Sequence, residues 1–157
     1  MLPSAHYFSG VASFALLSAL RIIPINFLYL SLMIILSIIP DIDFIITSSH
    51  REVFTHSPIF WIVVIAAAIL FQPSSWIIVI PLSTHLLLDT VDWGLMIFYP
   101  FSSKKYGLKL LEKEAARESE RFTSYLREYV SHPRLLYLEF AIMILSLLLL
   151  FVVGICI

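Results

Sequence analysis

Histidine and aspartate residues gather in a few short groups within a chain that is otherwise rich in Ile, Leu, Val and Phe. The groups are His6, the pair Asp41 and Asp43 after a proline, the segment from 50 to 57, and His85 with Asp89. Charged groups are expensive in apolar surroundings, so those that occur there usually face one another, water or an ion. Imidazole and carboxylate together form the ligand set of zinc and similar divalent metals. The pattern therefore predicts a metal site within a membrane protein.

The spacing within two of these groups favours shared ligation. His85 and Asp89 are four residues apart in an expected helix, so they lie on one face about one turn apart, and Asp92 continues that face. The alternative is a hydrogen-bonded pair that holds two helices together. Asp41 and Asp43 are two residues apart, so in an extended segment both carboxylates point the same way and can reach one ion. The alternative for them is turn capping beside a proline.

The third group is a loop that ends where a helix is expected to begin. His50 and His56 bracket this loop, which can fold two imidazoles around one metal, and Ser57 followed by proline is a strong helix start. Arg51 either contacts a substrate phosphate or pairs with an aspartate. His6, at the start of the first apolar run, is either a ligand or a structural histidine.

The composition places the chain among integral membrane proteins. Of its 157 residues 60% are hydrophobic and 13% charged, with a mean hydropathy of +0.95, whereas a soluble domain is about 45–50% apolar and about 25% charged. The single Cys156 excludes a disulfide framework and a thiolate metal site. The apolar residues form five runs, roughly 7–20, 25–39, 58–71, 76–99 and 135–157. These runs predict an all-α, polytopic membrane helical bundle of about 4–5 transmembrane helices, with the last two runs long enough to span and the first three short.

One polar segment, residues 102–134, interrupts the apolar sequence before the last run. Its apolar residues recur at three- and four-residue intervals from Leu108 to Tyr129, which predicts an amphipathic helix within a single membrane domain covering 1–157. Eight of the ten Lys and Arg residues fall in it. Because such an excess marks the cytoplasmic side, we expect the N-terminus of this membrane protein to be cytoplasmic. Counting back through the runs then places the His and Asp groups near the cytoplasmic leaflet.

Taken together, these residues resemble the membrane-bound, metal-dependent hydrolase family that includes the YdjM-type, LexA-binding, inner-membrane-associated hydrolases. The matching positions, which cover most of residues 1–102, are His6, Pro40-Asp41-Ile42-Asp43, His50-Arg51, Thr55-His56-Ser57, His85-Leu86-Leu87-Leu88-Asp89, Trp93-Gly94 and Tyr99-Pro100-Phe101-Ser102. The family is similar to zinc-dependent phospholipase C and the fungal zinc nucleases, which use clustered His and Asp ligands to cut phosphodiesters. This chain departs from the family pattern at Glu52-Val53-Phe54, where many members have Gly after Arg, and at Phe44, where His is frequent.

From the residues and the resemblance we expect a membrane-embedded, metal-dependent hydrolase that acts on a phosphoester in a phospholipid or another amphiphilic substrate. Asp92 would either support the metal ligands or accept a proton, and Arg51 would contact the phosphate. The cofactor would be zinc or a similar divalent metal, as two or three ions, and nothing in the sequence indicates nucleic-acid binding. Two alternatives stay open: a transporter that uses the same residues as an ion or proton pathway, and a membrane scaffold that recruits a soluble partner. The expected metal ligands are His6, Asp41, Asp43, His50, His56, His85 and Asp89.

Overall fold

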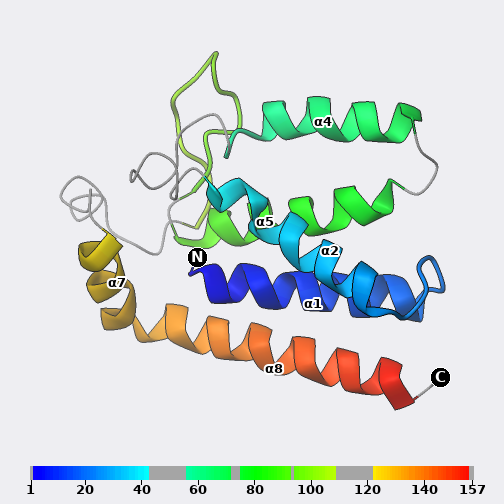
Figure 1. The fold of residues 1–157 in the computed structure, drawn as a ribbon. Coiled ribbons are helices and arrows are strands. Elements are labelled where there is room, and N and C mark those ends of the chain that lie inside the picture. The colour runs from blue at the N-terminus through cyan, green and yellow to red at the C-terminus, as the bar shows by residue number, and fades with distance from the viewer. Residues whose placement is uncertain (1, 43–55, 72–74, 93, 109–121, 156–157) are drawn as a thin grey trace.

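The fold is built from helices that alternate in direction and bring several of their ends to one side of the molecule (Figure 1). The computed structural model describes residues 2–42, 56–71, 75–92, 94–108 and 122–155. Within them the helices are α1 (Pro3–Ala19), α2 (Phe27–Ile38), the short 3-10 helix η1 (Ile39–Asp41), α4 (Pro58–Phe71), α5 (Trp76–Asp92), α7 (Phe122–Ser131) and α8 (Pro133–Ile155).

Helix α1 lies at the centre of the packing, because it contacts α2, α5 and α8. Its buried apolar face includes Phe14 and Leu17, which form one core with Ile23 and Met33. Helix α4 lies at the outside and packs on α5 (Figure 1). The start of α1, the end of α2, the starts of α4 and α8 and the end of α5 all lie at the same end of the bundle, on the left in Figure 1. That end is the one where the His and Asp groups were expected to meet.

The expectation of four to five membrane spans is wrong. Among the described residues one helix is long and apolar enough to cross a membrane, the 22-residue stretch Pro133–Gly154 of α8. The helices α1, α2, α4 and α5 have 17, 12, 14 and 17 residues. At about 1.5 Å per residue they extend roughly 18–26 Å, which is less than the roughly 30 Å of a hydrocarbon core.

The predicted helix length differs most from the structure in the fourth apolar run, where a span was expected to continue to residue 99. Helix α5 ends at Asp92, and the chain then turns through Gly94, which has a φ of 76°. Leu95 pairs with Tyr106 in an isolated antiparallel bridge, so the apolar residues after the helix belong to a loop. Hydropathy alone does not distinguish such a loop from the end of a helix.

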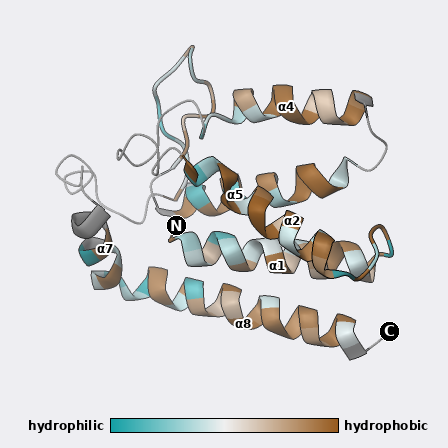
Figure 2. Cartoon of the chain, viewed as in Figure 1, coloured by the Kyte–Doolittle hydropathy of each residue, from teal (hydrophilic) through white to brown (hydrophobic). Residues whose placement is uncertain are grey.

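The outer surface of the bundle agrees with a membrane environment. Phe140 and Phe151 on α8 are 58% and 65% exposed, and much of the helical ribbon in Figure 2 has the brown of hydrophobic residues. Apolar side chains exposed over such a continuous surface mark contact with lipid or another protein. The polar segment expected over 102–134 is only partly described: 102–108 is not helical, and 122–131 forms α7. Its assignment as one amphipathic helix within a single membrane domain stays a prediction.

Candidate metal centre

Helix α1 positions His6 in its second turn, and a carboxylate on α8 holds the beginning of that helix. Pro3 occupies the first helical position, where its missing N–H leaves no hydrogen bond unmade. The backbone N–H of Leu2 donates to Glu139 Oε1 at 2.9 Å, and the Ser4 hydroxyl donates to Glu139 Oε2 at 2.7 Å. An anionic group at a helix N-terminus is favourable because unpaired N–H groups and the helix dipole point there. Glu139 therefore fixes the end of α1 that carries His6.

The end of α2 positions both Asp41 and His85. After Ile38 the chain tightens into η1, which contains Pro40 and ends at Asp41. The carbonyl of Ser37 belongs to the last turn of α2 and accepts a hydrogen bond from His85 Nδ1 at 2.6 Å. Because a carbonyl only accepts, Nδ1 of His85 carries a proton and donates it, so Nε2 is the ring nitrogen that can face a metal.

Ser37 also joins α2 to α1. Its hydroxyl lies 2.8 Å from the backbone oxygen of His6 and 2.9 Å from that of Ile34, and it shares one proton between them. Ser37 is fully buried, and through its hydroxyl and its carbonyl it contacts both His6 and His85. Ser37 is not among the site residues predicted from the sequence. The sequence feature that could have identified Ser37 is its position as a polar residue within an apolar run, four residues before Asp41.

The remaining residues of the site come from the turn before α4 and from the second half of α5. His85 and Asp89, four residues apart on α5, are both completely buried. His56 lies in the turn immediately before α4 and is 5% exposed. The Ser57 hydroxyl that follows it donates to the backbone oxygen of Tyr99 at 3.4 Å, which links this turn to the loop after α5. Helix α4 begins at Pro58, where the sequence predicted a helix start.

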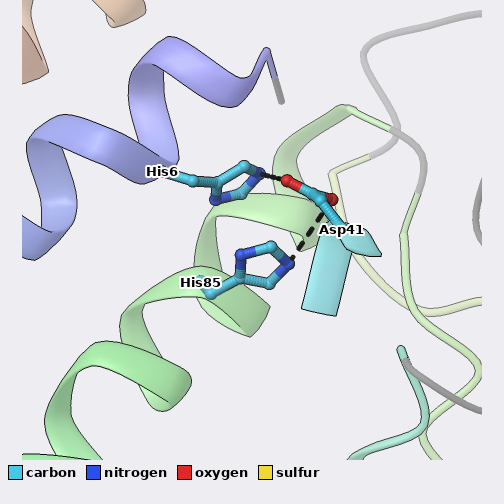
Figure 3. Close-up of side chains that lie close together, drawn as sticks. All are labelled: His6, Asp41 and His85. Atoms are coloured by element: carbon cyan, nitrogen blue, oxygen red, sulfur yellow. Dashed lines mark ion pairs between the residues drawn. The ribbon is translucent and has the colours of Figure 1, made fainter. Parts of the chain in front are cut away.

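Five of the seven predicted ligands thus meet in one place, which we call the His/Asp cluster: His6, Asp41, His56, His85 and Asp89. Figure 3 shows His6 and His85 on neighbouring helices with Asp41 facing both. The rings of His6 and His85 are stacked with their centroids 3.8 Å apart. Asp41 and Asp89 each face the histidines with both carboxylate oxygens. One oxygen faces His6, and the other faces His56 and His85.

The distances within the His/Asp cluster match those between ligands of one metal. Asp89 lies 3.3 Å from the Nε2 atoms of His6 and His56 and 3.4 Å from that of His85. Asp41 lies 3.4 Å from Nε2 of His56 and 3.8 Å from those of His6 and His85. Two atoms bound tetrahedrally at about 2.0–2.1 Å from zinc are about 3.3–3.4 Å apart. The donor atoms of His6, Asp41 and His85, and those of His56, His85 and Asp89, lie within 4.8 Å of one another.

Several of these buried atoms are not used in hydrogen bonds. Within the described part of the chain, both ring nitrogens of His6, Oδ2 of Asp41 and Nε2 of His85 have no hydrogen-bond partner. A buried polar atom without a partner costs about 1–3 kcal/mol, so native proteins rarely keep several together without a ligand. The donors therefore fit a divalent cation better than they fit a hydrogen-bonded staple between helices.

The protonation states agree with that chemistry. Burial, and after it the charge of His85, lowers the pKa of His6 to about 4, while Asp89 opposes the shift. His6 is therefore a neutral imidazole at pH 7, which is the form that binds metal. Burial raises the pKa of Asp41, but its hydrogen bond with His56 and the charges of His85 and His6 outweigh burial and lower that pKa to about 2. Asp41 is consequently a carboxylate at neutral pH.

The other predicted site residues are not placed by the structure. Asp43, His50 and Arg51 lie outside the described residues, so their roles as ligands and as a phosphate contact stay predictions. Asp92 is the last residue of α5, but its side chain is also outside the described set. His132 lies between α7 and α8, and its backbone N–H donates to the backbone oxygen of Tyr129 at 3.1 Å.

Comparison with known proteins supports the resemblance drawn from the sequence. No curated protein and no solved structure matches the chain. A family model does match, and it covers residues 1–155 under the description "YdjM inner membrane protein". The match extends well beyond residue 102, through α7 and α8, and it agrees with a location in the inner membrane. The chain therefore belongs to the YdjM inner membrane protein family.

Proposed function

We propose that this protein is a metal-dependent hydrolase of the inner membrane that cleaves a phosphoester in an amphiphilic substrate. The observation that carries the proposal is the convergence of five buried donor residues, several with unused ring-nitrogen or carboxylate atoms, at distances of 3.3–3.8 Å. Perturbed, clustered ionisable groups of this kind are concentrated at functional sites.

The described donors are sufficient for one ion. His85 has a single available nitrogen, because Nδ1 is bonded to Ser37, so His85 binds one ion at a time. His6, Asp41, His56 and Asp89 supply the remaining donors. A second or third ion would require the carboxylates to bridge and further ligands from Asp43 and His50. Zinc suits this mixture of imidazole and carboxylate.

In hydrolysis, a water oxygen bonds to phosphorus, the ester P–O bond breaks, and the departing oxygen takes up a proton. A bound divalent metal would lower the pKa of its water towards about 7 and stabilise charge on the phosphoryl oxygens. The chain's own residues contribute the neutral imidazole of His6, which needs no deprotonation to bind, and the hydrogen bond from His85 to Ser37, which fixes one ring. Arg51 would contact the phosphate, and Asp92 would accept the proton of the water.

The site lies next to the basic segment of the chain. Leu2, four residues before His6, packs against Tyr129 and Leu135 at the junction of α7 and α8. We therefore assign the cluster to the same side of the membrane as that segment, the cytoplasmic side. The ionisable residues described here gather at one end of the bundle, whereas a transport pathway would have them staggered across the bilayer.

Metal analysis of the purified protein tests the proposal. The wild type should contain stoichiometric zinc or a similar metal, and the His85→Ala, Asp89→Ala double variant should lose it, while His132→Ala keeps it. Metal-loaded wild type should then hydrolyse a phosphoester in a panel of amphiphilic substrates. A metal-free protein whose stability does not change under strong chelation would refute the proposal. Metal or proton flux into proteoliposomes without phosphoester turnover would favour a transporter.

A further inference from the structure

Beside the His/Asp cluster runs an open groove of about 340 Å³ between α5 and α8, with α1 as its floor. Its floor includes Ser9 and Ser13, its α5 wall includes Thr84 and Leu88, and its α8 wall includes Leu145 and Ser146. Ligand pockets begin at about 300 Å³, so the groove is large enough to hold a small ligand.

The groove is apolar even though four hydroxyl groups line it. Ser9, Ser13, Thr84 and Ser146 each donate to a backbone oxygen three or four residues earlier on their own helix, at 2.8, 2.8, 2.9 and 2.6 Å. Their protons are therefore used within the protein. What these residues contribute to the groove is their small size, because a larger side chain at the same positions would fill it. The groove thus offers contact surface to a hydrocarbon and little hydrogen bonding to a polar ligand.

The groove comes within about one helical turn of the His/Asp cluster along α1 and α5, and α8 forms one of its walls. Ser9 follows His6 by three residues and Leu88 follows His85 by three, so the near end of the groove is about one helical turn from two imidazoles. Its α8 wall belongs to the helix long enough to cross the bilayer. A molecule in the groove would therefore have one end at the cluster and the rest beside lipid.

The dimensions of the groove distinguish a hydrocarbon chain from a helix. The lining residues span eight or nine positions on each helix, and the seven or eight rises between the end residues correspond to about 10–12 Å along the axis. A volume of about 340 Å³ over that length corresponds to a cross-section of about 30 Å². An α-helix with side chains is about 10–12 Å across, or roughly 80–110 Å². One alkyl chain fits this space, and a helix of a second protein copy does not.

We propose that the groove binds one hydrocarbon chain of the substrate, and that the phosphoester of the same molecule then lies at the His/Asp cluster. This inference rests on the proposed function and names its substrate class as an amphiphile whose chain is drawn from the membrane. A hydrocarbon chain that moves from lipid into an apolar groove gains little hydrophobic free energy. The groove would therefore serve to position the reacting group and not to supply affinity.

The test uses two photoreactive probes with the full-length protein in phosphatidylcholine vesicles. One probe is a long-chain alkyl phosphonate, which resists hydrolysis, and the other is the alcohol of the same chain. Both carry a diazirine halfway along the chain, and mass spectrometry locates the labelled residues.

Ala12→Leu places a larger side chain in the groove, and Ala141→Leu is the matched control on the exposed face of α8. If Ala12→Leu does not fold, Leu145→Trp serves with Leu147→Trp as its control, since both residues are exposed on α8 and only Leu145 lines the groove.

We expect both probes to label groove residues on α1, α5 and α8, and the phosphonate to label them more strongly when metal is bound. Ala12→Leu should lose this labelling and keep its metal, while Ala141→Leu retains both. Labelling spread evenly over the apolar surface of metal-loaded protein, unchanged in Ala12→Leu, would overturn the inference and leave the proposed function standing. Equal labelling by phosphonate and alcohol in a protein that binds no metal would instead refute the proposed function. Disulfide-linked dimers of Leu145→Cys with the probes excluded would assign the groove to a second copy and overturn the inference.

Discussion

Gly10 lies where α1 and α2 pack together without room for a side chain. A Cβ atom placed there would meet the Ser37 hydroxyl, would lie 2.8 Å from the Cα atom of Ile34, and would lie 2.9 Å from the backbone oxygen of Met33. Ordinary van der Waals contact begins at 3.4 Å. Since two of the three neighbours are backbone atoms, no side-chain rotation relieves the overlap. Gly10→Ala should therefore push α1 and α2 apart by about 0.6 Å, the difference between 2.8 and 3.4 Å.

That displacement acts directly on the His/Asp cluster. His6 precedes Gly10 by one helical turn, and Asp41 follows Ser37 by one turn on the other side of the contact. The pair His6 Nε2 and Asp41 Oδ2, now 3.8 Å apart, would separate further from the roughly 3.3 Å expected of two ligands on one zinc ion. Metal sites tolerate about 0.2 Å in their bond lengths, so a shift of about 0.6 Å weakens binding. We expect metal affinity to fall about 10–100-fold, as when a supporting contact is lost.

The same change should lower stability. Overpacking costs about 1–3 kcal/mol, and the better helix propensity of Ala returns at most about 1 kcal/mol. The assay is a competitive metal titration of the purified protein, together with thermal unfolding in the presence of chelator. Gly154→Ala is the matched control, because no atom lies within 4 Å of its added Cβ, so metal affinity should not change. Metal affinity and unfolding of Gly10→Ala equal to those of the wild type would refute this account of the α1–α2 contact.

Three further changes test the surroundings of the cluster. Because burial lowers the pKa of His6 from 6.5 to about 4, the unfolded chain takes up its proton first as the pH falls. Metal-free protein should therefore lose up to about 3 kcal/mol of stability between pH 6.5 and 4, and His6→Asn should reduce this slope in a denaturant titration at each pH. Glu139→Gln weakens charge-assisted hydrogen bonds at the start of α1, so the free energy of unfolding should fall by about 1.5–3 kcal/mol while Glu139→Ala loses more. Ser37→Ala removes a hydroxyl but keeps the carbonyl that holds His85, so stability should fall by about 1 kcal/mol with metal content unchanged.

The sequence predicted the positions of the helices well and the lengths of the membrane spans poorly. The run at 58–71 coincides with α4, and the run at 25–39 contains α2 and the first residue of η1. Both are bounded by turn-forming residues that act locally, such as Pro58 and Asn26, whose side chain accepts a hydrogen bond from Tyr29 N–H at 3.0 Å. The run at 76–99 was taken as one span because its composition stays apolar. The end of α5 is instead set by Gly94 and by the pairing of Leu95 with Tyr106, which composition does not reveal.

The residues that form the His/Asp cluster could be predicted from the sequence, whereas the residues that hold its helices together could not. The alternation of five helices brings His6, Asp41, His56 and the end of α5 to one side, and the i, i+4 spacing of His85 and Asp89 selects one face. Ser37 and Gly10 carry no such pattern. Their roles arise from a contact between α1 and α2, which is a property of the folded pair and not of either segment.

The charge of the cluster gives a reason for a cation that does not depend on the distances between ligands. Asp41 and Asp89 carry up to two negative charges in a place where they are 8% and 0% exposed, and His6 is neutral at pH 7 because burial lowers its pKa. Taking a carboxylate out of water costs several kcal/mol unless an opposite charge compensates it. In the described part of the chain, the groups that face both aspartates are the imidazoles of His6, His56 and His85. One divalent ion balances two carboxylates, so a second ion would need an additional anion such as Asp43 or the substrate phosphate. Metal stoichiometry measured with and without a phosphonate ligand therefore reports on whether the substrate completes the site.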